Sequence, residues 1–162
     1  MPGSAATSPA AGATDMLDAA AVEAYLHDRI PLSRLMGVRV SACDELGVRL
    51  YAPLAPNINH RGTVFGGSAS AVAMLCGWAL VHARIADLPF KTGLVIRRNQ
   101  MQFDHPIDDD FEAWCQSPDE DSLAEFDAAL AAGKARLELA VELYDGDRRC
   151  ATFRGVYVAM RN

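Results

Sequence analysis

The sequence lacks the residue patterns of a metal site, a disulfide framework or a nucleic-acid-binding surface. Its four cysteines are scattered, with no C-x-x-C pair and no histidine at metal-ligand spacing. We interpret them as reduced thiols of a cytoplasmic protein, and we expect no metal and no cofactor of its own. The formal net charge of −6 argues against nucleic acid as a partner, because duplex binding requires a dense basic surface.

Neither a targeting signal nor a membrane span is indicated. Residues 1–15 hold no basic residue and no apolar core, so they match neither a signal peptide nor a transit peptide. Because they contain few bulky apolar side chains, we predict a disordered tail. The most apolar stretch, residues 69–81, is too short to cross a bilayer and contains Ser70, Gly77 and Trp78. We therefore predict a buried helix of a soluble protein and no membrane partner.

Residues 16–162 are long enough for one domain and short for two. Their periodicity predicts helices separated by runs of strands. The predicted elements are a helix at 16–35 interrupted by Pro31, a hairpin of 38–42 with 48–52, a long apolar helix from Ser68 to about Asp87, strands at 92–101 and 111–116, an acidic helix at 119–130, and a hairpin of 137–143 with 152–160 around Asp145-Gly146.

This order of elements predicts an α+β fold in which an antiparallel sheet curves around one central helix. The long helix is apolar on nearly every side, which is typical of a helix enclosed by other structure. We expect the sheet to cover part of it and a second protomer to cover the rest, in a homodimer that could pair further into a tetramer. An unrelated α+β sandwich is the alternative.

Residues 57–67 combine groups that a structural turn does not need together. They include the amides of Asn57 and Asn59, the imidazole of His60 and the guanidinium of Arg61, and three glycines lead into the long helix. Glycines let the backbone approach a ligand, and a helix N-terminus adds unpaired N–H donors and partial positive charge. Together they favour a site for an oxyanion or an enolate oxygen. The structural alternative is that the asparagines cap a turn and the glycines satisfy backbone geometry.

A longer string around this loop, A-P-L-A-P-N-I-N-H-R-G-T-V-F-G-G-S at residues 52–68, is followed by Gly77-Trp78. On these residues the chain resembles the YiiD C-terminal-type putative thioesterase domains, over residues 25–160. The resemblance implies a hot-dog fold, an antiparallel sheet wrapped around a long central helix, and activity on acyl thioesters of acyl carrier protein or coenzyme A. That family includes malonyl-acyl-carrier-protein decarboxylases, which supply acetyl units to start fatty-acid synthesis.

The resemblance leaves two reactions open. Thioester hydrolysis requires a nucleophile or a base that activates water, and related thioesterases commonly have a carboxylate on the central helix. Here residues 57–86 contain no Asp or Glu, and Phe65 stands where many relatives have His. His60, or a carboxylate of the partner subunit such as the partner's Asp104 or the partner's Asp108, could substitute. Decarboxylation of a malonyl thioester needs no activated water, only donors for the enolate oxygen.

We therefore favour decarboxylation of malonyl-acyl-carrier protein, with thioester hydrolysis as the alternative and a non-catalytic carrier-binding module as a third possibility. The substrate brings its own phosphopantetheine. Asn59 is predicted to be the main catalytic group, with Asn57 and His60 as orienters, and Gly66, Gly67 and Phe65 are predicted to lie at the oxyanion or enolate. The residues predicted to bind the substrate or carrier are Arg61, Thr63, Ser68, Arg97 and Arg98. Arg97 and Arg98 could equally be solvated.

The remaining candidate side chains are interpreted as structural. Cys76, inside the long helix, resembles a small buried apolar residue more than a nucleophile. His27, His82 and His105 have no partners at useful spacing and are predicted to be structural or surface residues.

Overall fold

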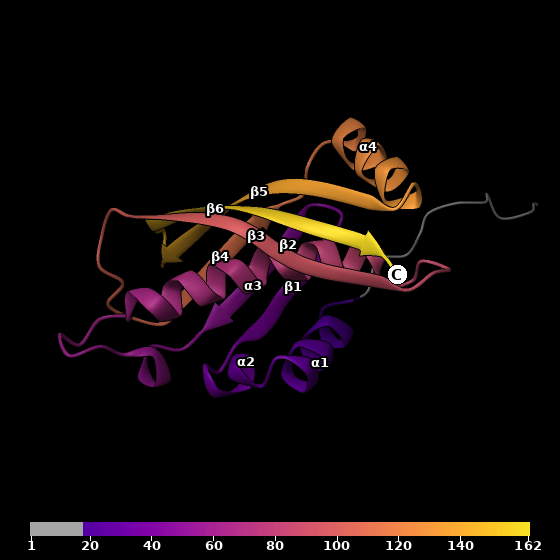
Figure 1. Cartoon of the computed structure of the whole chain (residues 1–162). Helices are drawn as coiled ribbons and strands as arrows, with labels where there is room; N and C mark the ends of the chain where they lie inside the picture. The colour runs from indigo at the N-terminus through magenta and orange to yellow at the C-terminus, as the bar shows by residue number, and fades with distance from the viewer. Residues whose placement is uncertain (1–17) are drawn as a thin grey trace, which may run out of the picture.

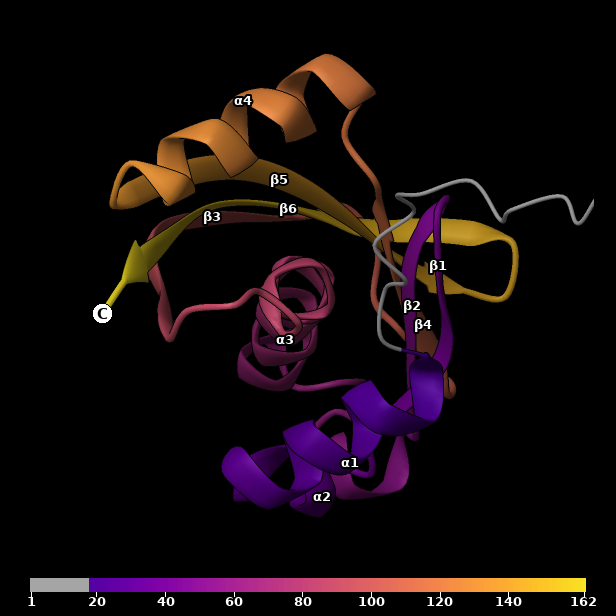
Figure 2. The same ribbon diagram turned by 90° about the vertical axis from the view of Figure 1, so that its right-hand side faces the viewer.

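Six antiparallel strands form one sheet that curves around helix α3 (Figures 1 and 2), which confirms the predicted α+β, hot-dog arrangement. The computed structural model describes residues 18–162, so the predicted tail at residues 1–15 lies outside the described residues. Across the sheet the strands follow the order β1-β2-β4-β5-β6-β3. Along the chain the elements are α1 (Ala19–Arg29), α2 (Pro31–Leu35), β1 (Arg39–Asp44), β2 (Gly47–Ala52), η1 (Ala55–Asn57), α3 (Gly66–Ile85), β3 (Thr92–Phe103), β4 (Phe111–Gln116), α4 (Glu120–Ala131), β5 (Lys134–Asp145) and β6 (Arg148–Arg161).

The predicted helix break and both predicted hairpins are present. Asp18 accepts a hydrogen bond from the backbone N–H of Ala21 at 2.8 Å and so caps α1, and Pro31 opens α2, where its missing N–H costs nothing. β1 pairs with β2, and β5 with β6. The long helix begins at Gly66 instead of Ser68, and β3 continues to Phe103 because it stays paired with β6.

Helix α3 lies on the concave side of the sheet and is largely buried (Figure 2). It has the length and hydropathy of a membrane-spanning helix, but 67% of its most apolar window is buried by the rest of the chain, as in a core helix. Gly77 lets the helix approach β6 closely, because a Cβ atom there would collide with the Tyr157 hydroxyl. That hydroxyl donates to the carbonyl oxygen of Met74 at 2.7 Å, and burial raises the pKa of Tyr157.

Helix α4 covers an opening in the sheet on the face opposite α3 (Figure 2). Strands β4 and β5 pair through three residue pairs, and beyond these they separate. Phe126 and Leu130 of α4 are 3% and 1% exposed and belong to the core. Arg84, near the end of α3, forms a two-point ion pair with Asp127 of α4, at 2.9 and 2.5 Å. The acidic helix is therefore an integral cover.

The two edge strands of the sheet differ in how their backbones are covered. Helix α1 lies along β1, where Glu23 accepts a hydrogen bond from the N–H of Val40 at 2.9 Å and His27 Nε2 donates to the carbonyl of Val38 at 2.7 Å. Among residues 18–162, no side chain of another element makes a hydrogen bond to the backbone of β3, the opposite edge. Val95 and Phe103 on β3 are 49% and 55% exposed. Such an edge presents unpaired N–H and C=O groups.

Candidate functional site

Asn57 fixes the start of the loop from inside the molecule. Its side chain is 2% exposed, and its Nδ2 atom donates to the carbonyl oxygens of Met36 at 2.9 Å and Pro53 at 2.7 Å. Its own carbonyl accepts a hydrogen bond from the N–H of Phe65 at 2.7 Å, which closes the loop at its other end. Through these bonds Asn57 holds the end of α2 and the start of the loop together.

Asn59 organises the tip of the loop and is half-buried. Its Oδ1 atom accepts from the N–H groups of Arg61 at 2.8 Å and Thr63 at 3.2 Å, which fixes the orientation of the amide. Its Nδ2 atom then donates to Thr63 Oγ1 at 3.0 Å and to the Val64 carbonyl at 3.4 Å. The second of these is long, so that hydrogen is held weakly. Gly62, with φ of +79°, provides the left-handed backbone conformation in the turn between Asn59 and Thr63.

Helix α3 begins directly after the loop, with free N–H donors at its first positions. Phe65 occupies the N-cap and provides no side-chain hydrogen bond. The first intrahelical bond runs from the N–H of Ala69 to the Phe65 carbonyl at 3.0 Å, so the amides of Gly66, Gly67 and Ser68 have no partner within the helix. A Cβ atom at Gly67 would collide with the Phe65 ring in the position that it occupies here.

A cavity of about 300 Å³ adjoins the start of α3, where Gly66 lines it. Its walls come from the loop, the start of α3 and the β3–β4 connection, and its lining residues are Val64, Gly66, Ala69, Phe103, Asp104, His105, Pro106 and Ile107. The N–H of Val64 donates to the Ile107 carbonyl at 2.9 Å, which ties the loop to the connection. The N–H groups of Asp104 and His105 both donate to the Cys150 carbonyl, which anchors the connection on β6.

Two titratable side chains of the β3–β4 connection line the cavity. Asp104, named above as a possible carboxylate of a partner subunit, also lines the cavity of its own subunit, with Oδ1 accepting from Gln102 Nε2 at 3.0 Å. His105 is exposed, in agreement with its prediction as a structural or surface residue, and it lines the same cavity. The sequence does not place either side chain at the start of α3, because that placement depends on the pairing of β3 with β6.

The remaining predicted site residues are exposed or half-buried on the loop, at the start of α3 or on β3. His60 and Arg61 are exposed at the tip of the loop, Phe65 is 57% exposed, and Thr63 and Ser68 are half-buried. Arg98 pairs in register with Val156, whereas Ile96 pairs with Tyr157, which contacts α3. Arg98 therefore faces the side of the sheet away from α3, where it lines a groove with Glu138 and Arg154. Arg97 lies at the exposed bulge between these positions. Within one subunit neither arginine joins the loop.

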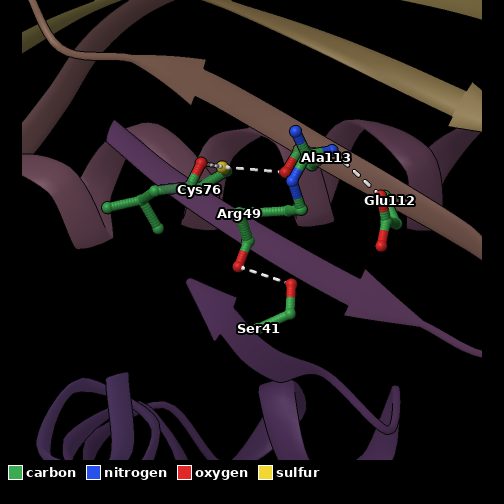
Figure 3. Close-up of polar contacts among 6 residues, drawn as sticks. Ser41, Arg49, Cys76, Glu112 and Ala113 are labelled. Atoms are coloured by element: carbon green, nitrogen blue, oxygen red, sulfur yellow. Dashed lines mark hydrogen bonds and ion pairs between the residues drawn. The ribbon is translucent and has the colours of Figure 1, made fainter. Parts of the chain in front are cut away.

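The thiol of Cys76 lies buried in α3. Cys76 Sγ donates to the backbone carbonyls of Val48 at 3.4 Å and Ala113 at 3.5 Å (Figure 3), and it is fully buried. Burial raises the pKa of this thiol well above its usual value, so the nucleophilic thiolate is scarcely formed at neutral pH. Within residues 18–162, no group of three or more His, Cys, Asp or Glu side chains is arranged to hold a metal ion.

His82 of α3 lies in an aromatic stack away from the loop. Its ring is 4.1 Å from that of Tyr25 and 4.7 Å from that of Trp78, measured between centroids. His82 is 8% exposed, and its Nε2 atom has no hydrogen-bond partner in the described structure. Burial lowers the pKa of this imidazole, so the stack favours its neutral form.

Comparison with known proteins identifies relatives of the whole described fold. A family model described as "Putative thioesterase (yiiD_Cterm)" matches residues 19–161. A protein of unknown function from Chlorobaculum tepidum TLS is 28% identical, with a TM-score of 0.84 over 89% of this chain and 94% of that one. A putative thioesterase from Shewanella oneidensis is 27% identical, with a TM-score of 0.76 over 88% and 96%. A probable thioesterase from Pseudomonas aeruginosa, 21% identical with a TM-score of 0.76 over 91% and 98%, shares the fold.

Proposed function

The chain belongs to the putative thioesterase family whose model covers residues 19–161, and we propose that it converts the malonyl thioester of an acyl carrier protein into the acetyl thioester. In this reaction the bond between C2 and the free carboxylate breaks, CO2 leaves, and the electron pair passes into a thioester enolate. A proton added at C2 then gives the acetyl product, which can initiate fatty-acid synthesis.

The observation that supports decarboxylation is a set of uncharged donors with no carboxylate on the helix behind them. Gly66 lines the cavity, Gly67 follows it in the first turn of α3, and helix α3 contains no Asp or Glu from Gly66 to Ile85. An enolate oxygen placed against this helix start would meet donors and the positive end of the helix dipole. Each well-placed donor is worth roughly 3 kcal/mol in the transition state.

Asn59 would complete this donor set. Its Nδ2 hydrogen bonds weakly to the Val64 carbonyl at 3.4 Å, and that hydrogen can turn to a stronger acceptor when an enolate forms. The Oδ1 bonds to Arg61 and Thr63 keep the amide in the orientation that presents the NH2 group. Thr63 Oγ1 accepts the other Nδ2 hydrogen, and this leaves its own hydroxyl hydrogen available to the substrate.

The cavity lining gives the substrate carboxylate a partly apolar environment. Val64, Ala69 and Phe103 line it together with the polar groups of the β3–β4 connection. A charged carboxylate is costly to hold against apolar surface, whereas CO2 is not, so this wall favours loss of CO2. His105 is the imidazole in the lining, and we assign it the delivery of the proton to C2.

Thioester hydrolysis is the second candidate, and Asp104 favours it. This carboxylate lines the same cavity as Gly66, so it could act as the base that activates a water beside the helix amides. Hydrolysis would thus use an acid from the β3–β4 connection in place of the acid that α3 lacks. Both reactions use the same hydrogen-bond donors. In hydrolysis a water attacks the thioester carbonyl, whereas in decarboxylation CO2 leaves from C2.

Mass spectrometry of malonyl-carrier protein after incubation with the purified protein tests these assignments. Acetyl-carrier protein supports decarboxylation, a free pantetheine thiol supports hydrolysis, and unchanged substrate contradicts both reactions. If decarboxylation is correct, Asn59→Ala should lower the rate by about 10²-fold, while Asp104→Asn should retain it. Loss of activity in Asp104→Asn, with a free thiol as the wild-type product, would select hydrolysis. Gln116→Ala removes an exposed amide at the end of β4 and serves as the control.

The uncovered edge at β3 supports a homodimer as the working form. A twelve-residue strand with an unpaired backbone edge and exposed apolar side chains such as Val95 and Phe103 is a template for pairing with a second copy. Such pairing would place Phe103, which lines the cavity, beside the partner chain. It would also bring Arg97 to the boundary between subunits.

A further inference from the structure

Helix α2 presents two large apolar side chains to solvent next to the loop. Leu32 and Leu35 are 54% and 74% exposed, and Ile58 of the loop is 51% exposed. The opposite side of the short helix is anchored, because Ser33 is fully buried. We call Leu32, Arg34, Leu35, Ile58 and Arg61 the α2 face. Exposed leucines gathered at one place on a protein are typical of a surface that another macromolecule covers.

A hydrogen bond and close packing connect the α2 face to the loop of the candidate site. Asn57 Nδ2 bonds to the Met36 carbonyl at the end of α2, and a Cβ atom at Gly37 would come within 2.7 Å of the Pro53 ring. Helix α2 and the segment from η1 into the loop lie along the same edge of the molecule in both views (Figures 1 and 2). A partner bound there would therefore lie beside the loop, from which Val64 lines the cavity.

The chain segments that form this face carry basic but no acidic residues, in a chain that is acidic as a whole. The sequence contains 21 Asp and Glu residues, yet none lies between positions 29 and 43 or between 46 and 86. Arg34 and Arg61 are exposed, and neither forms an ion pair with another described residue. Their charge is therefore available to an incoming anionic surface.

We infer that the α2 face is the docking surface for an acidic acyl carrier protein, an inference that rests on the proposed function. An apolar centre bordered by unpaired arginines matches a protein surface with an apolar centre and an acidic border. A small thioester alone would leave the leucines uncovered. A symmetric contact with a second copy would set Arg34 and Arg61 against the same arginines, which disfavours that occupant.

Two substitutions on α2, outside the cavity, test this inference. Leu35→Asp and Arg34→Glu should each raise KM for malonyl-carrier protein by about tenfold or more, and should leave turnover of malonyl-pantetheine, which has no carrier, unchanged. The controls are Leu46→Asp, at a leucine that is 72% exposed in the β1–β2 turn, and Arg136→Glu, at an exposed arginine on β5. Both should behave as the wild type with either substrate.

Direct titration of the protein with holo-carrier protein, in place of turnover, separates this inference from the proposed function. Weaker carrier binding by the α2 variants alone supports the docking surface even if no thioester is converted. Equal binding by wild type and variants overturns it, whatever reaction the protein performs. A variant that loses malonyl-pantetheine turnover as well, or that changes its mass in light scattering, also overturns it, because the face would then belong to the site or to a contact between copies.

Discussion

Asn57 and Asn59 are two residues apart in the loop and lie in opposite environments. Asn57 is buried and bonded to the backbone of neighbouring segments, whereas Asn59 is half-buried and bonded within its own turn. We therefore expect substitution of Asn57 to affect stability and substitution of Asn59 to affect the proposed turnover. A sequence string in which both are asparagine gives no indication of this division.

Asn57→Ala should lower the free energy of unfolding by about 2 kcal/mol, because it leaves the Met36 and Pro53 carbonyls buried without their donor. Urea denaturation followed by circular dichroism measures this. Gln116→Ala, at an exposed position, should change stability by less than about 0.5 kcal/mol. Unchanged stability of Asn57→Ala would show that the loop is not anchored through this amide.

His82 should make stability depend on pH. Because burial lowers the pKa of this imidazole below its usual 6.5, the unfolded chain takes up the proton more readily than the folded one. Its contribution is complete above pH 6.5 and is lost as the pH falls below that value. One proton limits the slope to about 1.4 kcal/mol per pH unit.

Replacing His82 with Phe keeps an aromatic ring beside Tyr25 and Trp78 and removes the titrating group. The variant should lose part of the fall in stability between pH 6.5 and 5 that urea denaturation of the wild type shows. His60→Gln, at the exposed loop tip, controls for the loss of an imidazole. Parallel pH profiles for wild type and His82→Phe would contradict the assignment.

At the scale of the element, helix α3 is held against the sheet by a close approach that only glycine permits. Gly77→Ala should improve helix propensity by about 1 kcal/mol, yet we expect a net loss of about 1–3 kcal/mol, because the added Cβ meets the buried Tyr157 ring. Thermal unfolding measures the sum. Ala129→Gly on the exposed side of α4 measures the propensity contribution alone. A stabilised Gly77→Ala variant would mean that Tyr157 can move.

Helix α4 shows how an element can be predicted without its role. Its acidic first turn and Asp119 cap follow from the sequence, since Asp119 accepts from the N–H of Ser122 at 2.8 Å. The position of α4 does not follow from the sequence, because it depends on β4 and β5 separating after Trp114. The buried Phe126 and Leu130 then occupy the opening, and Arg84 reaches across it to Asp127.

At the scale of the whole molecule, the free β3 edge should determine the oligomeric state. Light scattering coupled to size-exclusion chromatography should give a dimer mass for the wild type and a monomer or weakened dimer for Val95→Asp, because a charge on this half-exposed apolar position opposes strand pairing. Leu46→Asp adds the same charge at an exposed leucine in the turn between β1 and β2, whereas β3 is at the opposite edge of the sheet. This control variant should remain dimeric. A monomeric wild type would contradict the proposed dimer.

The elements, the central helix and the loop were determined by the sequence on its own. Alternation marked the hairpins, Pro31 marked the helix break, and the glycines before Ser68 marked a helix start able to approach a ligand. These features depend on neighbours along the chain, and local backbone preferences are enough to produce them.

The tertiary structure alone decided which side chains share the cavity. It brought Asp104 and His105 to the start of α3, turned Arg98 to the opposite face of the sheet, and buried Asn57. Each of these placements depends on strand order and register, since one residue of register decides which face of a sheet a side chain occupies. The register of β3 on β6 is set by contacts between segments far apart in the chain, which no local pattern specifies.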